Sequence, residues 1–287
     1  MARVLTSPRI LPAVLMAALA FATVSCSPSS PASSGGMSQS SPDMHMGDPN
    51  GGLAMSEQGY TFDSSSSSLP VNGNQEYRFR ILSPTGKPQT SFAIDQTQLM
   101  HFYVVRADLT NYQHLHPELA SDGTWSTHLP PSAPGPYRVY ASFIARDSSN
   151  KEHELVLSRE LTVPGTYQSV ALPAANSTTE VDGYTVALQG QQVSGMGMPF
   201  TVHITRRGQP VTNLQPYLGT YAHLTAFRSG NLAFAHLHPE QTARSGKGGG
   251  PDLTFHAQLP AAGDYRLFLQ FQTEGQLHTA AITVHAG

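Results

Sequence analysis

Residues 223–239, HLTAFRSGNLAFAHLHP, carry the pattern that decides the fold, and residues 101–117, HFYVVRADLTNYQHLHP, carry it a second time. Both stretches begin with a histidine, place the next histidine thirteen residues later and end in His-Leu-His-Pro. In each stretch two short apolar runs flank a turn sequence, which is typical of an antiparallel hairpin. Two copies at one spacing indicate a tandem repeat with a histidine-bearing hairpin in each unit.

Segments outside the hairpins support this duplication. Gly-Lys-Pro at 86–88 precedes the first histidine set, and Gly-Gln-Pro at 208–210 precedes the second. Gly-Pro-Tyr-Arg at 135–138 and Gly-Asp-Tyr-Arg at 263–266 follow them at comparable distances. The repeat therefore extends over most of each unit.

Strand patterns dominate both units. Short segments rich in aromatic and β-branched residues, bounded by Pro, Gly and Asp-Gly, are found at 77–82, 101–105, 137–143, 155–163, 200–205, 223–227, 233–238, 265–271 and 280–284. About seven such strands in roughly 105 residues are typical of an immunoglobulin-like sandwich. We therefore predict an all-β protein with two tandem immunoglobulin-like antiparallel β-sandwiches, at 59–164 and 182–287, joined by a linker at 165–181.

The first 26 residues have the composition of an export signal. Arg3 and Arg9 give a basic start, and an apolar run at 10–24 ends in small residues before Cys26. Cys26 stands where a bacterial lipoprotein is cleaved and acylated, although Thr23 departs from the usual leucine of that motif. We predict an extracytoplasmic protein, either anchored to the membrane by lipid at Cys26 or secreted.

The amino-acid composition limits which partners the chain can bind and whether disulfide bonds can stabilise it. Cys26 is the single cysteine, so the chain cannot form an internal disulfide. Removal of the predicted export signal takes away Arg3 and Arg9, so the 16 basic side chains fall to 14. Against 19 acidic side chains this gives a formal charge of −5 with neutral histidine. This balance does not indicate a nucleic acid partner.

A second group of candidate ligands lies in the segment 27–58, which we predict to be a flexible tether rich in Ser, Pro, Gly and Met. Met44, His45 and Met46 are consecutive there. Thioether and imidazole groups suit soft ions such as Cu(I). The alternative is that a linker tolerates methionine without any function.

The hairpin geometry predicts convergence of the repeated histidines. If the second turn centres on Gly230-Asn231, His223 lies opposite His238, and His236 points to the same face. Equal spacing predicts the same arrangement for the first set, whose members are His101, His114 and His116. Three neutral imidazoles around one point are ligands for Cu or Zn.

Two other functions stay open. The histidines can instead be structural, each donating a ring N–H to a carbonyl. The opposite strand face carries Phe102, Val104 and Leu115 and so faces the core, which leaves the histidine face to solvent or to a neighbouring domain. The chain would then be a structural or interaction lipoprotein of the cell envelope. An enzyme is the weakest of the three hypotheses, since no general base, nucleophile turn or phosphate loop can be named.

The residues 100–109, MHFYVVRADL, followed by Gln-His-Leu-His-Pro at 113–117, resemble a segment of bacterial exported proteins that are often named heavy-metal-binding or YtkA-like. The second copy, from Leu214 to Pro239, is similar to the C-terminal unit of that family. The resemblance covers most of residues 59–286. It implies an exported β-sandwich protein in copper or heavy-metal handling, with no known catalytic activity and no identified protein partner.

Overall fold

The computed structural model describes residues 51–69, 75–130, 132–244 and 246–287. These residues belong to one compact unit, His45–Gly287. Every helix or strand assigned in this part of the chain is a β-strand, which confirms the predicted all-β class. The search for a membrane-crossing helix among the described residues accordingly finds none. The predicted signal peptide, Cys26 and the Met44-His45-Met46 sequence lie outside the described residues.

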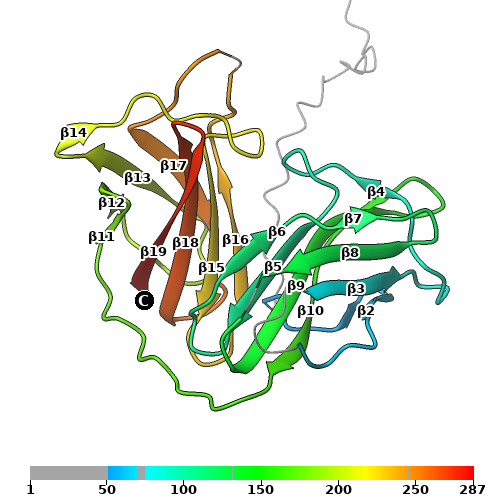
Figure 1. Cartoon of the computed structure of the whole chain (residues 1–287). Helices are drawn as coiled ribbons and strands as arrows, with labels where there is room; N and C mark the ends of the chain where they lie inside the picture. Colours follow the sequence, from blue (N-terminus) through cyan, green and yellow to red (C-terminus); the bar gives the residue numbers. More distant parts are fainter. Residues whose placement is uncertain (1–50, 70–74, 131, 245) are drawn as a thin grey trace, which may run out of the picture. The chain divides into compact units, whose positions relative to one another are not determined.

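The first sandwich consists of two antiparallel sheets (Figure 1). One sheet has the strand order β1-β2-β3-β8-β7 and the other β10-β9-β5-β6, with β4 paired to β9. The bounds are β1 Ser56–Glu57, β2 Tyr60–Asp63, β3 Gln75–Leu82, β4 Phe92–Ala93, β5 His101–Arg106, β6 Gln113–Leu115, β7 Glu118–Leu119, β8 Thr124–Leu129, β9 Gly135–Arg146 and β10 Glu152–Val163.

The second sandwich repeats this plan with one continuous hydrogen-bonded order, β11-β12-β13-β17-β16-β15-β18-β19, and with β14 on β13. The order is continuous because β16 pairs with β15 through Phe234–Leu237 and with β17 through His238 and Pro239. The bounds are β11 Thr178–Val181, β12 Tyr184–Gln189, β13 Met198–Arg206, β14 Gln209–Pro210, β15 Ala222–Arg228, β16 Phe234–Pro239, β17 Asp252–Ala257, β18 Gly263–Thr273 and β19 Gln276–Ala286.

Each predicted strand segment coincides with an observed strand, and several strands are longer than predicted. β1 lies before residue 59, where we placed the start of the first sandwich, and β11 lies inside the predicted linker. Both are short strands that pair with the next strand through a tight turn with positive φ, at Gln58-Gly59 and at Asp182-Gly183. Short polar strands of this kind lack the apolar alternation on which the boundaries were drawn.

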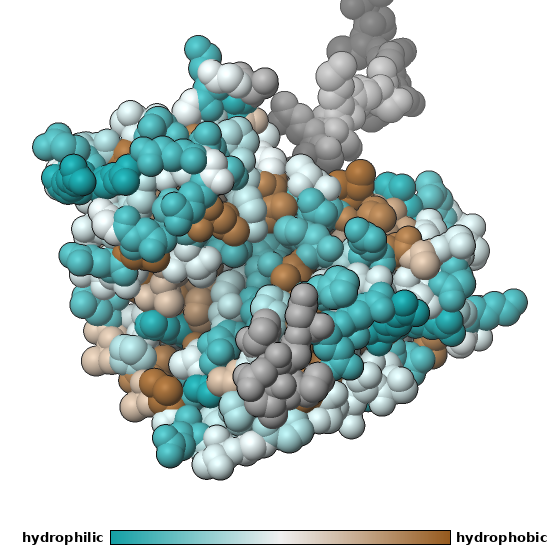
Figure 2. All heavy atoms as spheres, in the orientation of Figure 1, coloured by the Kyte–Doolittle hydropathy of each residue, from teal (hydrophilic) through white to brown (hydrophobic). Residues whose placement is uncertain are grey.

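Each sandwich has its own apolar core, formed by alternate residues of its strands. In β3 the buried residues Tyr77, Phe79 and Ile81 alternate with exposed arginines. The single tryptophan, Trp125 on β8, is fully buried in the first core. In Figure 2 the visible face is mostly hydrophilic with scattered apolar residues, as expected when these cores take up most large apolar side chains.

The repeated Gly-x-Tyr-Arg sequences form the same corner in both sandwiches. The Tyr137 hydroxyl donates to the Ala133 carbonyl at 2.8 Å, and the Tyr265 hydroxyl donates to the Ala261 carbonyl at 2.7 Å. This hydrogen bond to a carbonyl a few residues upstream is the tyrosine corner of immunoglobulin-like sandwiches. It supports the predicted fold at the point where the repeat is most similar.

Strand β5 is buried on both of its faces. Phe102 and Val104 point into the first core, while Tyr103 and Val105 belong to a separate apolar cluster. That cluster also contains Phe227, Phe234 and Phe268 of the second sandwich, together with Leu109 and Tyr140 of the first. The histidine-bearing face of β5 therefore lies against the second sandwich. Of the two predicted environments for this face, solvent and a neighbouring domain, the structure has the neighbouring domain.

We expect Tyr137→Phe to lower the free energy of unfolding by about 1 kcal/mol, because the Ala133 carbonyl loses its donor while the ring stays packed. Denaturant unfolding followed by the fluorescence of Trp125 measures this in the first sandwich. Tyr167→Phe is the matched control, since it keeps an aromatic ring beside Arg106. Equal midpoints for the two variants would contradict a stabilising corner.

Candidate metal centre

The first histidine set is positioned by the β5–β6 hairpin. The register pairs Phe102 with Leu115, so the next pair along the ladder places His101 across from His116. The turn at 108–111 is held by Asp108, whose carboxylate accepts from the Thr110 amide at 3.2 Å. The hairpin register that the sequence predicted for this unit is therefore confirmed.

The three imidazoles of this hairpin converge. One ring nitrogen from each of His101, His114 and His116 lies within 4.8 Å of the other two. The closest pair is His101 Nδ1 and His114 Nε2, 3.0 Å apart. His101 is fully buried, and the other two are partly exposed. The structure thus brings together the first predicted set.

The hydrogen bonds behind two of these rings favour one tautomer of each. His101 Nε2 lies 3.2 Å from the carbonyl oxygen of Asp95, and His114 Nδ1 lies 2.7 Å from Oε1 of Gln270. Both oxygens only accept, which favours a proton on each of these outer nitrogens. In the neutral rings the inner nitrogens, His101 Nδ1 and His114 Nε2, then face each other with lone pairs.

His116 contributes a third nitrogen that lacks a partner. Its Nε2 is buried and makes no hydrogen bond in the described part of the chain. Buried polar atoms are rarely left without a partner unless an ion or water supplies one. Two facing lone pairs and one unpartnered nitrogen make this cluster a candidate site for a cation.

A proton is a poor occupant of this site near neutral pH. Burial lowers the pKa of His101, although the Asp95 carboxylate and carbonyl oppose this. Burial also lowers the pKa of His114 well below its usual value and that of His116 to about 4, and the neighbouring imidazoles add to both shifts. All three rings are therefore predominantly neutral at pH 7, the state in which imidazole binds metals.

His223 of the second set lies beside the first set. Its ring stacks on His114 with centroids 4.5 Å apart and on His101 at 5.4 Å. His223 Nδ1 lies 2.9 Å from Oε1 of Gln96, and its Nε2 lies 3.0 Å from the hydroxyl of Tyr103. Both ring nitrogens of His223 thus have partners in the first sandwich, and the ring forms a wall of the site.

The remaining predicted ligands are described only in part. The observed pairing of Leu224 with Leu237 is the register required to place His223 opposite His238, and His236 pairs with Thr225. The side chains of His236 and His238 lie outside the described part of the structure. Met44, His45, Met46 and the predicted lipidation site Cys26 also lie outside it, so these assignments stay predictions.

The sequence reasoning missed the residues that hold the rings, above all Gln270 and Asp95. One signal was present: Gln270 interrupts the apolar run LFLQF at 267–271 of β18. It pairs with His223 in the sheet, just as Ser142 pairs with His101 in the first sandwich. At this equivalent position the first repeat has a short hydroxyl side chain, Ser142, and the second repeat has a long amide, Gln270.

The histidines without a counterpart in the other repeat have different surroundings. Five of them lie within 3.0 Å of a carboxylate oxygen: His153 with Asp147, His203 with Asp252, His256 with Glu240, His278 with Asp182 and His285 with Asp264. These five rings therefore contact carboxylates and lie outside the repeated cluster.

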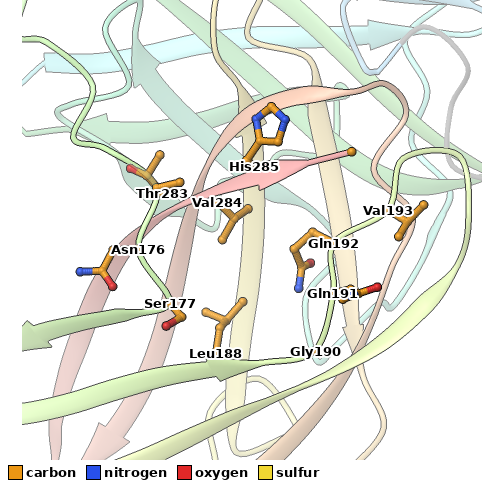
Figure 3. A pocket seen from close by; sticks show the side chains of 12 residues that line it. Asn176, Ser177, Leu188, Gly190, Gln191, Gln192, Val193, Thr283, Val284 and His285 are labelled. Carbon is orange, nitrogen blue, oxygen red and sulfur yellow. The ribbon is translucent and has the colours of Figure 1, made fainter.

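A cavity of about 520 Å³ lies elsewhere, in the second sandwich. Figure 3 shows it between β12, β19 and the segment before β13, with His285 and Gln192 on its walls. None of the residues that line it belongs to the repeated histidine sets. The candidate metal centre is therefore the histidine cluster and not this cavity.

The class of this chain follows from a family comparison. A family model described as "Domain of unknown function (DUF8832)" matches residues 55–156 and 179–287, so the chain belongs to that family. The two matched segments fall on the two sandwiches. A comparison with curated proteins finds no match.

Matches to solved structures are weak, and the chain spans 27% of the first of them. The S-layer protein rSbsC(31-844) is 14% identical with a TM-score of 0.23, and the match covers 79% of this chain and 27% of that one. Yersinia pseudotuberculosis InvD is 12% identical with a TM-score of 0.25, covering 80% and 58%. Invasin, a bacterial integrin-binding protein, is 11% identical with a TM-score of 0.24, covering 82% and 41%. These likenesses define neither a partner nor an activity for this chain.

In the metal-free protein the free energy of unfolding should fall as the pH drops from about 6.5 to about 4. Unfolded histidine titrates near pH 6.5, whereas the folded pKa of His116 is about 4 and those of His101 and His114 are also lowered. In this window the unfolded chain binds more protons, so acid destabilises the fold. Denaturant unfolding in chelator across this pH range measures the slope.

The double variant His114→Leu/His116→Leu should show a flatter slope, because two of the three imidazoles whose pKa is lowered are removed. Equal slopes for parent and double variant would be evidence against neutral burial of the cluster.

Proposed function

We propose that this chain is a non-enzymatic metal-binding protein that takes up one Cu(II) or Zn(II) ion through His101, His114 and His116. The observation that carries the proposal is the pair of inner nitrogens 3.0 Å apart whose outer nitrogens are both bound to acceptors. Neutral rings in this arrangement repel each other, and a cation between them turns the repulsion into two bonds. Three imidazoles and one open position are common around these ions.

The spacing of the nitrogens supports an ion of this size. Ligand nitrogens about 2.0–2.1 Å from a tetrahedral zinc ion are roughly 3.3–3.4 Å from one another. The observed separations run from 3.0 Å to at most 4.8 Å and bracket that value. Small rotations of the side chains, mainly of the partly exposed His116, close the site around an ion.

The hydrogen bonds from Asp95 and Gln270 are the outer contacts of a metal-binding histidine. Ligating imidazoles commonly donate their second N–H to a carbonyl or carboxylate, which fixes the tautomer and strengthens the ligand. His101 and His114 both meet this condition. In the purely structural alternative one of the two rings takes its other tautomer and donates its inner N–H across the 3.0 Å gap, so that its outer nitrogen loses the hydrogen bond to the Asp95 carbonyl or the Gln270 amide oxygen.

The site of action that we propose is outside the cytoplasm, with the protein held at the membrane by lipid on Cys26 or secreted. The export-signal composition of residues 1–26 and the resemblance to heavy-metal-binding exported proteins support this. Met44, His45 and Met46 in the tether are proposed as a weaker capture site for soft ions. The chain would sequester metal or transfer it to a partner that the sequence does not identify.

A second candidate function is a structural or interaction module of the cell envelope. His223 favours it, because both of its ring nitrogens are bonded to the first sandwich and its ring is completely buried. Under this hypothesis the repeated histidines stabilise the contact between the two sandwiches. The two functions differ in whether the cluster binds an ion.

Calorimetric titration of the full chain with Zn(II) and with Cu(II) tests the proposal. We expect one tight equivalent that disappears in His114→Ala/His116→Ala, because two of the three ligands are removed. His203→Ala/His285→Ala is the matched control: it removes two histidines paired with carboxylates outside the cluster, and binding should persist.

His236→Ala/His238→Ala tests the second predicted set in the same experiment, and Met44→Ala/Met46→Ala tests the tether. Absence of any tight equivalent in a folded parent protein would refute the metal-binding function and leave the structural module. Retained emission of the buried Trp125 shows that the first sandwich of each variant is folded, and an unchanged circular dichroism spectrum shows the same for the whole chain.

A further inference from the structure

We propose that the second sandwich is part of the metal centre. In this proposal Gln270 positions His114 for ligation, and ion binding in turn tightens the contact between the two sandwiches. The inference rests on the proposed metal-binding function and deepens it, because it makes one centre depend on both repeats.

Gln270 is well placed to orient His114. It lies on β18, is 5% exposed, and its Oε1 accepts from His114 Nδ1 at 2.7 Å across 156 residues of sequence. Its amide nitrogen lies 3.5 Å from the hydroxyl of Thr279, its partner on β19, which turns the amide oxygen toward His114. His114 Nε2 is thereby left as the ligating atom.

Loop residues of the first sandwich connect the two sides of the cluster. Asp95 holds His101 through its carbonyl, and the next residue, Gln96, binds His223 through its side chain. The hydroxyl of Tyr103 lies 3.0 Å from His223 on the other side of that ring. The wall of the site therefore stays in place only while the sandwiches are in contact.

The contact extends from the cluster into an apolar interface. Tyr103 belongs to the apolar cluster shared by the two sandwiches. Tyr112 stacks on Phe268 with centroids 4.1 Å apart and planes 5° apart, and its hydroxyl accepts from Thr225 at 3.1 Å. Separating the sandwiches would remove the support of His114 together with these contacts.

Reciprocal coupling follows from this geometry. An ion that binds more tightly when His114 is held by Gln270 favours the state in which the sandwiches are docked. The same free energy appears as tighter docking in the presence of the ion. Release of the ion is correspondingly easier when the sandwiches separate, which gives a partner protein a means of taking it.

Titration of Gln270→Leu with Zn(II) tests the positioning role. We expect the affinity to fall by roughly ten- to a hundredfold, as is usual when the outer partner of a ligating histidine is lost. Gln270→Glu supplies another acceptor and should restore binding close to that of the parent. Gln272→Leu, two residues along β18, is the matched control and should bind like the parent.

Hydrogen exchange tests the coupling between the sandwiches. Strand β18 contains no histidine, so slower exchange of its amides on adding Zn(II) reports docking and not ligation. We expect this protection in the parent and in Gln272→Leu, and its loss in Gln270→Leu at equal occupancy of the site.

The two proposals fail in different ways. If the parent binds Zn(II) and His114→Ala/His116→Ala does not, the metal site stands. Equal affinities for the parent and Gln270→Leu, or unchanged exchange of β18 in the loaded parent, would then overturn only the role of the second sandwich. A parent that binds no Zn(II) overturns both.

Discussion

The inner nitrogens of His101 and His114 face each other 3.0 Å apart, and the surrounding contacts are arranged to hold them there. The Asp95 carbonyl binds one ring from behind, and the Gln270 amide oxygen binds the other. Burial keeps a proton from relieving the repulsion near neutral pH. A cation between the nitrogens would satisfy both lone pairs while both outer hydrogen bonds are kept. The hairpin, the Asp95 loop and the second sandwich all contribute to this one arrangement.

Alternation along β5 accounts for the location of the site. Phe102 and Val104 take part in the core of the first sandwich, so the intervening side chains must point the other way. Tyr103 and Val105 use that second face to build the apolar contact with the second sandwich. The histidine at the start of the strand shares this direction and is buried at the edge of the contact. A candidate ligand set that would otherwise face solvent is thus desolvated by the second sandwich.

The two repeats have the same plan but use it differently. His101 and His223 occupy equivalent positions, paired with Ser142 and Gln270 respectively. Gln270 is the longer of these two partners and reaches across the interface to a histidine of the other sandwich. His223 instead has its two nitrogens bonded to Gln96 and Tyr103. Both repeats carry the histidines, and the different residues around them make one set a candidate ligand set and place His223 beside it.

The sequence alone determined the all-β class, the strands, and the hairpin register that brings His101, His114 and His116 together, because strand periodicity and turn residues act over short distances. The duplication was also evident, because the repeated segments can be recognised directly in the amino-acid sequence. The tertiary structure decided that His223 lies against the first set, that Gln270 holds His114, and that the site is buried between sandwiches. These contacts join residues more than one hundred positions apart, and no local pattern encodes which faces of two separately folded sheets will meet.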